Sequence, residues 1–415
     1  MDAHTLTVVV VFVFVYLGMI LGGLPFLQLD RTGIALLGAI ALVATGTVGL
    51  EEAWQAIHVP TLILLFAFMV MSAQLRLGGF YDWVTRKVGG QDIAPPLLLG
   101  TLIFVVGGLS AVFSNDVICL AMAPVLIDVC LARRLNPVPF LLALACSANI
   151  GSALTLIGNP QNMLIGQKLQ LSFFGYIREA ALPVLLGLIV TWGFIAWSSR
   201  RQWGDLHGEP RAPGHPRGEE PLPINRWQTA KGLSIAAAVF LLFLLAPLPR
   251  DVVALTAAGL LMLSRKLHSR KMLGLVDWQV LVLFIGLFVV NHSMEKTGLP
   301  GQAVDSLHAA GIRLEHPGAL FVTTFVLSNI MSNVPAVMLL LPVATHEVAG
   351  PLLALASTLA GNLLIVGSIA NIIVVDAAER RRIRIDWKRH ARVGVPVTLM
   401  TMALSGVWLA WRIGR

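Results

Sequence analysis

Short polar motifs interrupt four of the apolar stretches of this chain. They are built from serine, threonine, asparagine, glutamine and glycine, with one carboxylate. Where glycine and asparagine interrupt a helix, backbone carbonyls lose their helical partners and can coordinate a cation. The half-helix that follows points its first N–H groups at an anion or polar solute. The motifs therefore predict a binding site for a small ion or solute. The candidate substrate- and ion-binding residues are Ser114, Asn115, Asp116, Asn149, Gly151, Ser152, Thr155, Gly158, Asn159, Gln161, Asn162, Ser328, Asn329, Ser332, Asn333, Thr358, Gly361, Asn362, Gly367, Ser368 and Asn371.

Any one of these glycines or serines could instead serve packing, because small residues are favoured where transmembrane helices touch. The recurrence of the same parts in both halves of the chain favours a site. Asp116 is the only acid in these motifs. Charged residues deep in a membrane are rare and are functional candidates by default, so Asp116 is predicted to carry a proton or to bind a cation. Its alternative role is to cap a helix that begins at Val117, and the two roles are compatible.

Other chemistries have weaker support. Cys119, Cys130 and Cys146 lie in apolar segments, where cysteine usually acts as a small hydrophobe, although a soft metalloid could use their thiols. The histidines have no metal-ligand spacing, so no metal or cofactor is expected. The chain has no phosphate-binding P-loop, so ATP hydrolysis would need a separate soluble ATPase partner. An aspartyl protease needs two carboxylates, and the motifs contain only Asp116, which argues against an intramembrane hydrolase. No enzyme is expected, and a channel stays an alternative.

The elements that must position these residues are membrane helices. Hydrophobic residues make up 56% of the 415 and charged residues 13%, which excludes an ordinary soluble domain. We predict an all-α polytopic membrane protein in the lipid bilayer, with about 10 transmembrane helices, two re-entrant hairpins and two broken helices. The hairpins are residues 95–132 and 317–346, and the broken helices are residues 138–170 and 350–376. The other apolar runs are 5–25, 32–50, 60–78, 180–198, 232–248, 251–264, 278–294 and 393–411.

Basic residues give the orientation of these helices. The net charge is +8, and most lysines and arginines lie in alternate loops between apolar runs. This pattern predicts cytoplasmic basic loops, with both termini outside the plasma (inner) membrane, rather than nucleic-acid binding. No basic residue precedes the first apolar run, so we expect a retained helix and not a cleaved signal peptide.

The two halves of the chain repeat. Ser114-Asn115 and Ser332-Asn333 are separated by the same distance as Pro124 and Pro342. An odd number of crossings in each half would insert the second copy upside down, which is typical of secondary transporters. The predicted organisation is a first inverted repeat at 1–198, a Pro/Gly-rich cytoplasmic linker at 199–230 and a second inverted repeat at 231–415.

These motifs resemble the ion transporter superfamily, nearest to its arsenite-permease branch, which includes silicon efflux carriers and sodium/proton antiporters of the D type. The likeness covers nearly the whole chain and implies an elevator-type transporter, usually a homodimer. The residues that carry it are Phe113-Ser114-Asn115-Asp116-Val117, Ser147-Ala148-Asn149-Ile150-Gly151-Ser152-Ala153, Gly158-Asn159-Pro160-Gln161-Asn162, Ser332-Asn333-Val334-Pro335, Gly361-Asn362 and Ala370-Asn371.

The resemblance also bears on the substrate. Sodium/dicarboxylate symporters of the superfamily have Ser-Asn-Thr at both hairpin tips, whereas this chain has Asp116 and Val334 in the third positions. That difference favours proton coupling. The leading hypothesis is proton-coupled efflux of a small inorganic anion or oxyacid such as arsenite or silicate. The alternatives are a sodium-coupled carboxylate or anion symporter and a sodium/proton antiporter of the same fold.

Overall fold

The computed structural model describes residues 2–24, 28–204, 223–309, 311 and 313–414. The described chain is almost entirely helical, which confirms the predicted fold class. Two-residue strands β1 and β2 form one antiparallel pair, with Gly23 opposite Asp30. Most of the predicted linker, residues 205–222, lies outside the described residues. The first-half elements are α1 (Ala3–Leu21), β1 (Gly23–Leu24), β2 (Leu29–Asp30), α2 (Arg31–Ala44), α3 (Leu50–Ala56), α4 (Val59–Leu77), α5 (Phe80–Gly89), α6 (Pro95–Val112), α7 (Asn115–Ala132), α8 (Pro137–Ser152), α9 (Pro160–Lys168) and α10 (Phe173–Ser198).

The second half follows the same order of long helices, hairpin and broken helix. Its elements are α11 (Arg226–Leu245), α12 (Arg250–Met262), α13 (Ser269–Leu273), α14 (Trp278–Lys296), α15 (Leu299–Ala309), α16 (Pro317–Met331), α17 (Asn333–Leu340), η1 (Leu341–Val343), α18 (Ala349–Ala360), η2 (Ile365–Gly367), α19 (Ile369–Arg380) and α20 (Trp387–Ile413).

Eight described helices are long and apolar enough to cross a membrane: α1, α4, α6, α7, α10, α11, α14 and α20. The chain is therefore a multi-pass membrane protein. Two of the eight, α6 and α7, are the arms of the first predicted hairpin. Helices α2 and α12 were expected to cross but have only 14 and 13 residues, fewer than the ~20 that span a bilayer core.

Local sequence signals explain where many helices begin. Proline occupies the first turn of α4, α6, α8, α9 and α16, where its missing N–H needs no partner. Aspartates cap α2, α14 and α20, since the carboxylates of Asp30, Asp277 and Asp386 accept hydrogen bonds from backbone N–H groups of the first turn. These caps fix the ends of the helices that surround the breaks.

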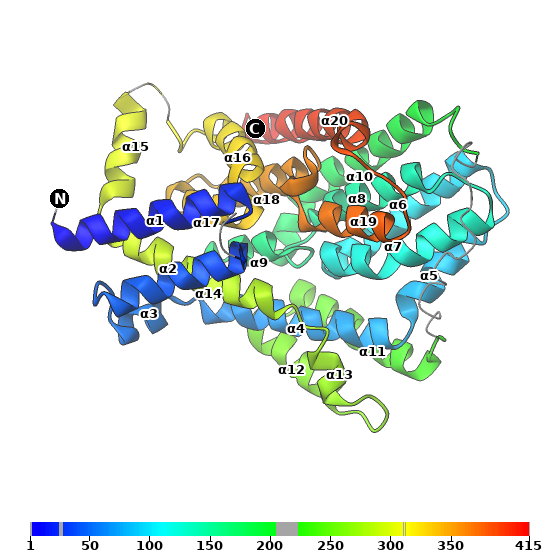
Figure 1. Ribbon diagram of the computed structural model, residues 1–415, viewed down its shortest axis with the longest axis horizontal. Coiled ribbons are helices and arrows are strands. Elements are labelled where there is room, and N and C mark those ends of the chain that lie inside the picture. Colours follow the sequence, from blue (N-terminus) through cyan, green and yellow to red (C-terminus); the bar gives the residue numbers. More distant parts are fainter. Residues whose placement is uncertain (1, 25–27, 205–222, 310, 312, 415) are drawn as a thin grey trace.

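Helix packing has an internal two-fold pattern. Helix α2 packs on α14 and α4 packs on α12, and the hairpin contacts α6 to α8 and α16 to α18 correspond in the same way. Long helices α10 and α20 pack on each other. In Figure 1, α4, α11 and α12 lie along one side of the molecule, and α18, α19 and α20 lie along the other. Each helix of the first half thus corresponds to the helix numbered ten higher in the second half, and corresponding helices make the same contacts, which agrees with the predicted repeats. The repeat boundaries and their opposite insertion stay predictions.

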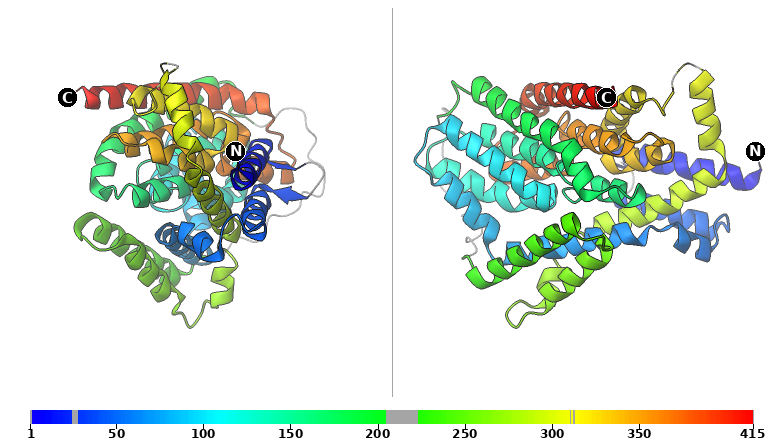
Figure 2. Two further views of the ribbon diagram at one scale, coloured as in Figure 1. Left: turned by 90° about the vertical axis from the view of Figure 1, so that its left-hand side faces the viewer. Right: turned by 180° about the vertical axis from the view of Figure 1, so that it is seen from behind.

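Helix α15 stands apart from this packing. The right view of Figure 2 shows it projecting beside the N-terminus of α1 and away from the helix bundle. It connects the end of α14 to the second hairpin, as α5 connects α4 to the first. The two hairpins are therefore each joined to a long helix through a short helical connection.

Candidate binding site at the helix breaks

The four predicted interruptions are present in the structure. The first hairpin turns between α6 and α7, with Ser114 as the N-cap residue of α7. The first broken helix is open over residues 153–159, and the second is open from Gly361 to Ser368 except for η2. The second hairpin turns at Ser332, which has φ +79° and ψ 159°. That backbone conformation is essentially reserved for glycine, and such strain concentrates at functional sites.

Asn149 connects the two halves of the chain at the breaks. Its Oδ1 accepts hydrogen bonds from the Asn115 side chain (2.9 Å) and the Ser368 hydroxyl (2.9 Å). Its Nδ2 donates to the side-chain oxygens of Asn362 (2.9 Å) and Asn371 (3.2 Å). Residues from the first hairpin, the first broken helix and the second broken helix therefore share one buried network.

The direction of these amides is set by the backbone. Asn371 Nδ2 donates to the carbonyls of Gly361 (2.7 Å) and Leu364 (3.0 Å), which can only accept. Its Oδ1 therefore faces Asn149 and requires the NH₂ end of that side chain. Asn149 in turn presents its oxygen to Asn115, whose NH₂ group must donate. The outcome is that Asn115 Oδ1 is left buried without a hydrogen-bond partner.

The second hairpin tip also presents amide oxygens. Asn329 donates to the carbonyl of Phe325 (2.9 Å), which leaves its Oδ1 unpaired, and that oxygen lies beside Gly367. Asn333 lies beside Gly361, and its Oδ1 is also unpaired. Both side chains therefore border the break that Asn149 contacts.

Buried polar atoms without partners concentrate at these tips. Leaving such a group unpaired costs about 1–3 kcal/mol, and folded proteins leave few of them. A cluster of them is therefore a candidate place for a ligand to bind. The unpaired atoms at the two tips and breaks are Ser110 Oγ, Asn115 Oδ1, Ser328 Oγ, Asn329 Oδ1, Asn333 Oδ1 and Asn362 Nδ2.

The first break, in contrast, is closed by its own hydrogen bonds. Asn159 donates to the hydroxyls of Ser152 (2.9 Å) and Thr358 (3.1 Å), and Gln161 also donates to Thr358 (3.3 Å). The Thr358 hydroxyl donates to Asn162 Oδ1 (3.3 Å). These residues are buried and have their partners, so their observed role is to hold α9 against α18.

Two further predicted residues tie this break to the first hairpin. The Thr155 hydroxyl donates to the carbonyl of Ala111, and the Asn115 N–H donates to the carbonyl of Gly158 (3.2 Å). A side chain on Gly158 would meet the Ser152 carbonyl oxygen at 2.2 Å. A side chain on Gly151 would likewise meet the backbone of Gly107 in α6 at 2.3 Å. Both glycines allow close backbone approach in the structure.

Asp116 lies in the first turn of α7, which begins at Asn115 and not at Val117. It does not cap that helix. Its carboxylate faces the backbone N–H of Ala370, in the first turn of α19. The N-terminus of α19 carries partial positive charge, so the acid of one half faces a helix end of the other. No basic side chain pairs with Asp116 among the described residues.

The other acid of α7 is paired differently from what its position in the sequence suggests. Arg133 is the basic residue nearest to Asp128 in the sequence, but the Asp128 carboxylate pairs with Arg381 of the other half at 2.5 Å. Arg133 instead donates to backbone carbonyls, including Gln91 (2.7 Å). This ion pair joins α7 to the end of α19.

The cysteines and metal ligands add no second centre to the described part of the chain. Cys119, Cys130 and Cys146 are buried free thiols. Histidine, cysteine and carboxylate side chains do not gather in groups of three or more within the described residues.

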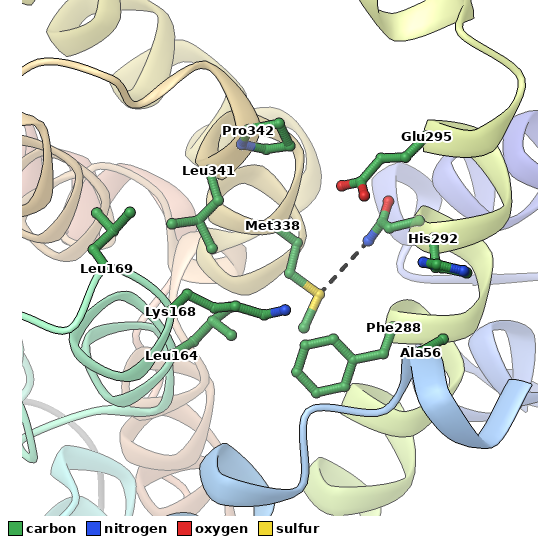
Figure 3. A pocket seen from close by; sticks show the side chains of 11 residues that line it. Ala56, Leu164, Lys168, Leu169, Phe288, His292, Glu295, Met338, Leu341 and Pro342 are labelled. Atoms are coloured by element: carbon green, nitrogen blue, oxygen red, sulfur yellow. Dashed lines mark hydrogen bonds between the residues drawn. The ribbon is translucent and has the colours of Figure 1, made fainter. Parts of the chain in front are cut away.

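A cavity of about 310 Å³ lies between the long helix α14 and the short helices α9 and α17. Figure 3 shows Lys168 and Glu295 extending into it from opposite sides, with Asn291 donating to the Met338 sulfur (3.6 Å). Sequence analysis did not identify this cavity. The available signal was the helical spacing of its lining on α14. Its lining residues are Ala56, Leu164, Lys168, Leu169, Phe288, Asn291, His292, Glu295, Met338, Leu341 and Pro342.

Helical hairpins packed against broken helices, with polar side chains buried at every break, define a polytopic membrane transporter fold. Among solved structures, the YdaH transporter of Alcanivorax borkumensis has a similar fold, with a TM-score of 0.55, 14% identity and coverage of 100% of this chain and 98% of that one. The chain belongs to the citrate transporter family, whose sequence model matches residues 9–351. The family places it in the ion transporter superfamily, as the motifs predicted.

Curated relatives are also transporters. An uncharacterized transporter of Mycobacterium tuberculosis is 29% identical, over 92% of this chain and 94% of its own length. The silicon efflux transporter LSI3 of Oryza sativa is 28% identical, with 92% of both chains covered. The putative transporter arsB of Dictyostelium discoideum is 22% identical, over 94% of this chain and 88% of its own.

The tight backbone contacts of Gly158 generate a stability prediction. We expect Gly158→Ala to lower the free energy of unfolding by about 1–3 kcal/mol, because the added methyl group meets backbone atoms that cannot move aside as a side chain could. Gly193→Ala in α10 is the matched control, since a side chain there meets nothing within 4 Å. Thermal unfolding of the purified variants compares the two; equal melting temperatures would contradict the packing.

The amide network generates a second prediction. Asn149→Asp keeps the size of the side chain but replaces its NH₂ group by an oxygen that faces two acceptors. We expect a loss of about 1–3 kcal/mol in the free energy of unfolding. Asn136→Asp is the control, because Asn136 only accepts a hydrogen bond, from Val138 N–H (3.0 Å), and the carboxylate retains it. Denaturation midpoints that fall equally for both would refute the deduced amide directions.

Proposed function

We propose that this protein is a secondary active transporter that exports a small undissociated oxyacid of the arsenite or silicate class in a proton-coupled cycle. The observation that carries the proposal is the set of unpaired amide oxygens at the two hairpin tips, in Asn115, Asn329 and Asn333. Amide oxygens accept hydrogen bonds and do not donate them. They therefore suit a solute that carries several O–H groups.

The charge of the site supports a neutral solute over an anion. The predicted site residues include no lysine, arginine or histidine, and their one ionisable group is the acid Asp116. Binding a bare anion among amide oxygens would leave its charge uncompensated, at a cost of several kcal/mol. Arsenous and silicic acids are uncharged near neutral pH. The printed names of the rice and Dictyostelium relatives, a silicon efflux transporter and arsB, point to the same chemical class.

Asp116 is the proposed proton carrier. Its position at the N-terminus of α19 lets its protonation change the contact between the first hairpin and the second broken helix. The proposed cycle loads the solute at the breaks and moves it in the elevator manner that the family resemblance implies. The cavity in Figure 3 lies between α14 and α9, and we assign it as the vestibule through which solute leaves on the outer side.

A second candidate function uses the same oxygens. Carbonyl oxygens are also preferred ligands of hard cations, and Asn115, Asn329 and Asn333 could hold Na⁺ for symport of a carboxylate such as citrate. The name of the family favours this candidate. The two functions differ in the gradient that drives transport.

Flux into proteoliposomes tests both. Purified protein is reconstituted and supplied with arsenite, silicate, citrate or phosphate under imposed pH or Na⁺ gradients. The proposal expects arsenite or silicate flux driven by the pH gradient alone, and lower flux when alkaline buffer ionises the acid. Citrate flux that requires Na⁺ would overturn it in favour of the second candidate.

The proton role is tested separately by Asp116→Asn. The amide keeps an oxygen facing the Ala370 N–H but cannot exchange a proton, so we expect flux driven by pH to fall about a hundredfold or more while the melting temperature changes little. Asp128→Asn on the same helix is the control. It weakens the pair with Arg381 and should lower stability while keeping pH-driven flux. Undiminished pH-driven flux in Asp116→Asn would remove that residue from the mechanism.

A further inference from the structure

A second polar pocket lies where α8 and α20 begin and α10 ends, away from the helix breaks. Its volume is about 280 Å³. Residues of three separate helices line it, and the basic loop before α20 adjoins it. The lining residues are Asn136, Val138, Pro139, Leu142, Ser198, Ser199, Gln202, Arg389, Arg392 and Val393.

The pocket has an apolar floor and a cationic rim. Val138, Pro139, Leu142 and Val393 are buried, whereas Arg389 and Arg392 are exposed. The rim also carries hydroxyl and amide groups of the α10 end. A pocket with an apolar floor and a cationic rim suits an amphipathic ligand, with an anionic group at one end and an apolar portion next to it.

The arginines of this pocket have no carboxylate partner of the kind found at the other end of α10 and α20. There, Arg412 of α20 forms a two-pronged ion pair with Glu179 of α10, at 2.5 and 2.9 Å. At this end Arg389 donates to the carbonyl of Arg384 (2.7 Å), and Arg392 makes no hydrogen bond or ion pair with the described part of the chain. The residues that line the pocket include no carboxylate.

One carboxylate lies nearby. Asp386 accepts a hydrogen bond from the backbone N–H of Arg389 (2.8 Å), which fixes it as the cap of α20. It lines a different cavity, so its charge offsets part of the Arg389 charge without entering the pocket. Arg392, one turn further along α20, keeps its charge available.

Exposed tryptophans place the pocket at the level of lipid headgroups. Trp197, in the last turn of α10, is 60% exposed and Trp387, at the start of α20, is 68% exposed. Arg200 and Lys388 each lie over one of these rings at 5.5 Å. Tryptophans and basic side chains at the ends of membrane helices mark the interface between hydrocarbon and water.

We propose that this pocket binds the phosphate headgroup of an anionic phospholipid. The guanidinium groups of Arg389 and Arg392 hold the phosphate oxygens, since arginine presents paired N–H donors that match them. The glycerol backbone and upper acyl chain cover the apolar floor. Basic pockets between membrane helices recognise lipid headgroups in this way. The bound lipid joins the ends of α10 and α20 where the protein supplies no acid.

Binding is measured on the full-length protein in detergent, by native mass spectrometry and by melting temperature, with phosphatidylglycerol or phosphatidylcholine added. The wild-type protein is expected to retain phosphatidylglycerol and to melt at a higher temperature with it than with phosphatidylcholine. The double variant R389Q/R392Q should lose this difference, with affinity for phosphatidylglycerol about thirtyfold weaker, as expected for about 1 kcal/mol per basic residue.

The control is R382Q/R384Q, which removes two charges from the loop before α20 but none from the pocket lining. It should behave like the wild type. Equal melting temperatures of all proteins in phosphatidylcholine confirm that the variants are folded. If R389Q/R392Q unfolds, the single variants R389Q and R392Q replace it, each with a roughly fivefold loss of affinity for phosphatidylglycerol. Inorganic phosphate at millimolar concentration is the third arm. Equal stabilisation by phosphate, or unchanged phosphatidylglycerol binding in the arginine variant, would overturn the proposal.

Discussion

The rest of this structure depends on keeping backbone and amide groups hydrogen-bonded where water is excluded. Helices that stop inside a membrane protein leave unpaired N–H and C=O groups, and these are tolerated only where other protein groups or a cavity satisfy them. Here, Asn371 bonds two carbonyls of the second break, and Asn149 carries that hydrogen bonding to the first hairpin. Because water is excluded from the breaks, polar groups of each half of the chain must supply hydrogen-bond partners to the other half.

The two breaks are alike in sequence but unequal in hydrogen bonding. In the first, Asn159, Gln161 and Asn162 bond to Thr358 and hold α9 against α18. In the second, Asn329 and Asn333 keep unpaired oxygens beside the glycines. The first break thus behaves as a structural joint, and the polar capacity that remains for a ligand lies toward the second hairpin.

Much of the fold could be predicted from sequence because each break carries a local signal. Glycine, asparagine and proline in an apolar run predict where a helix stops, and all four stops occur where expected. Partners distant in the chain could not be predicted. Asp128 has Arg133 close by in sequence, yet α7 and α19 pack together and bring Arg381 to it instead. The cavity around Lys168 escaped prediction for the same reason, since helices α3, α9, α14 and α17, from both halves of the chain, contribute its walls.

The backbone at Ser332 makes the two hairpin tips energetically different. Ser114, at the equivalent turn, has an ordinary φ of −55°, whereas Ser332 is held at +79°. A non-glycine residue in that conformation costs of order 1–3 kcal/mol. The second tip therefore stores conformational strain: loss of the packing around Ser332 relieves that strain, whereas the backbone at Ser114 has none to relieve. The two hairpins carry the same Ser-Asn motif, and this one backbone angle makes their tips differ in the free energy needed to rearrange them.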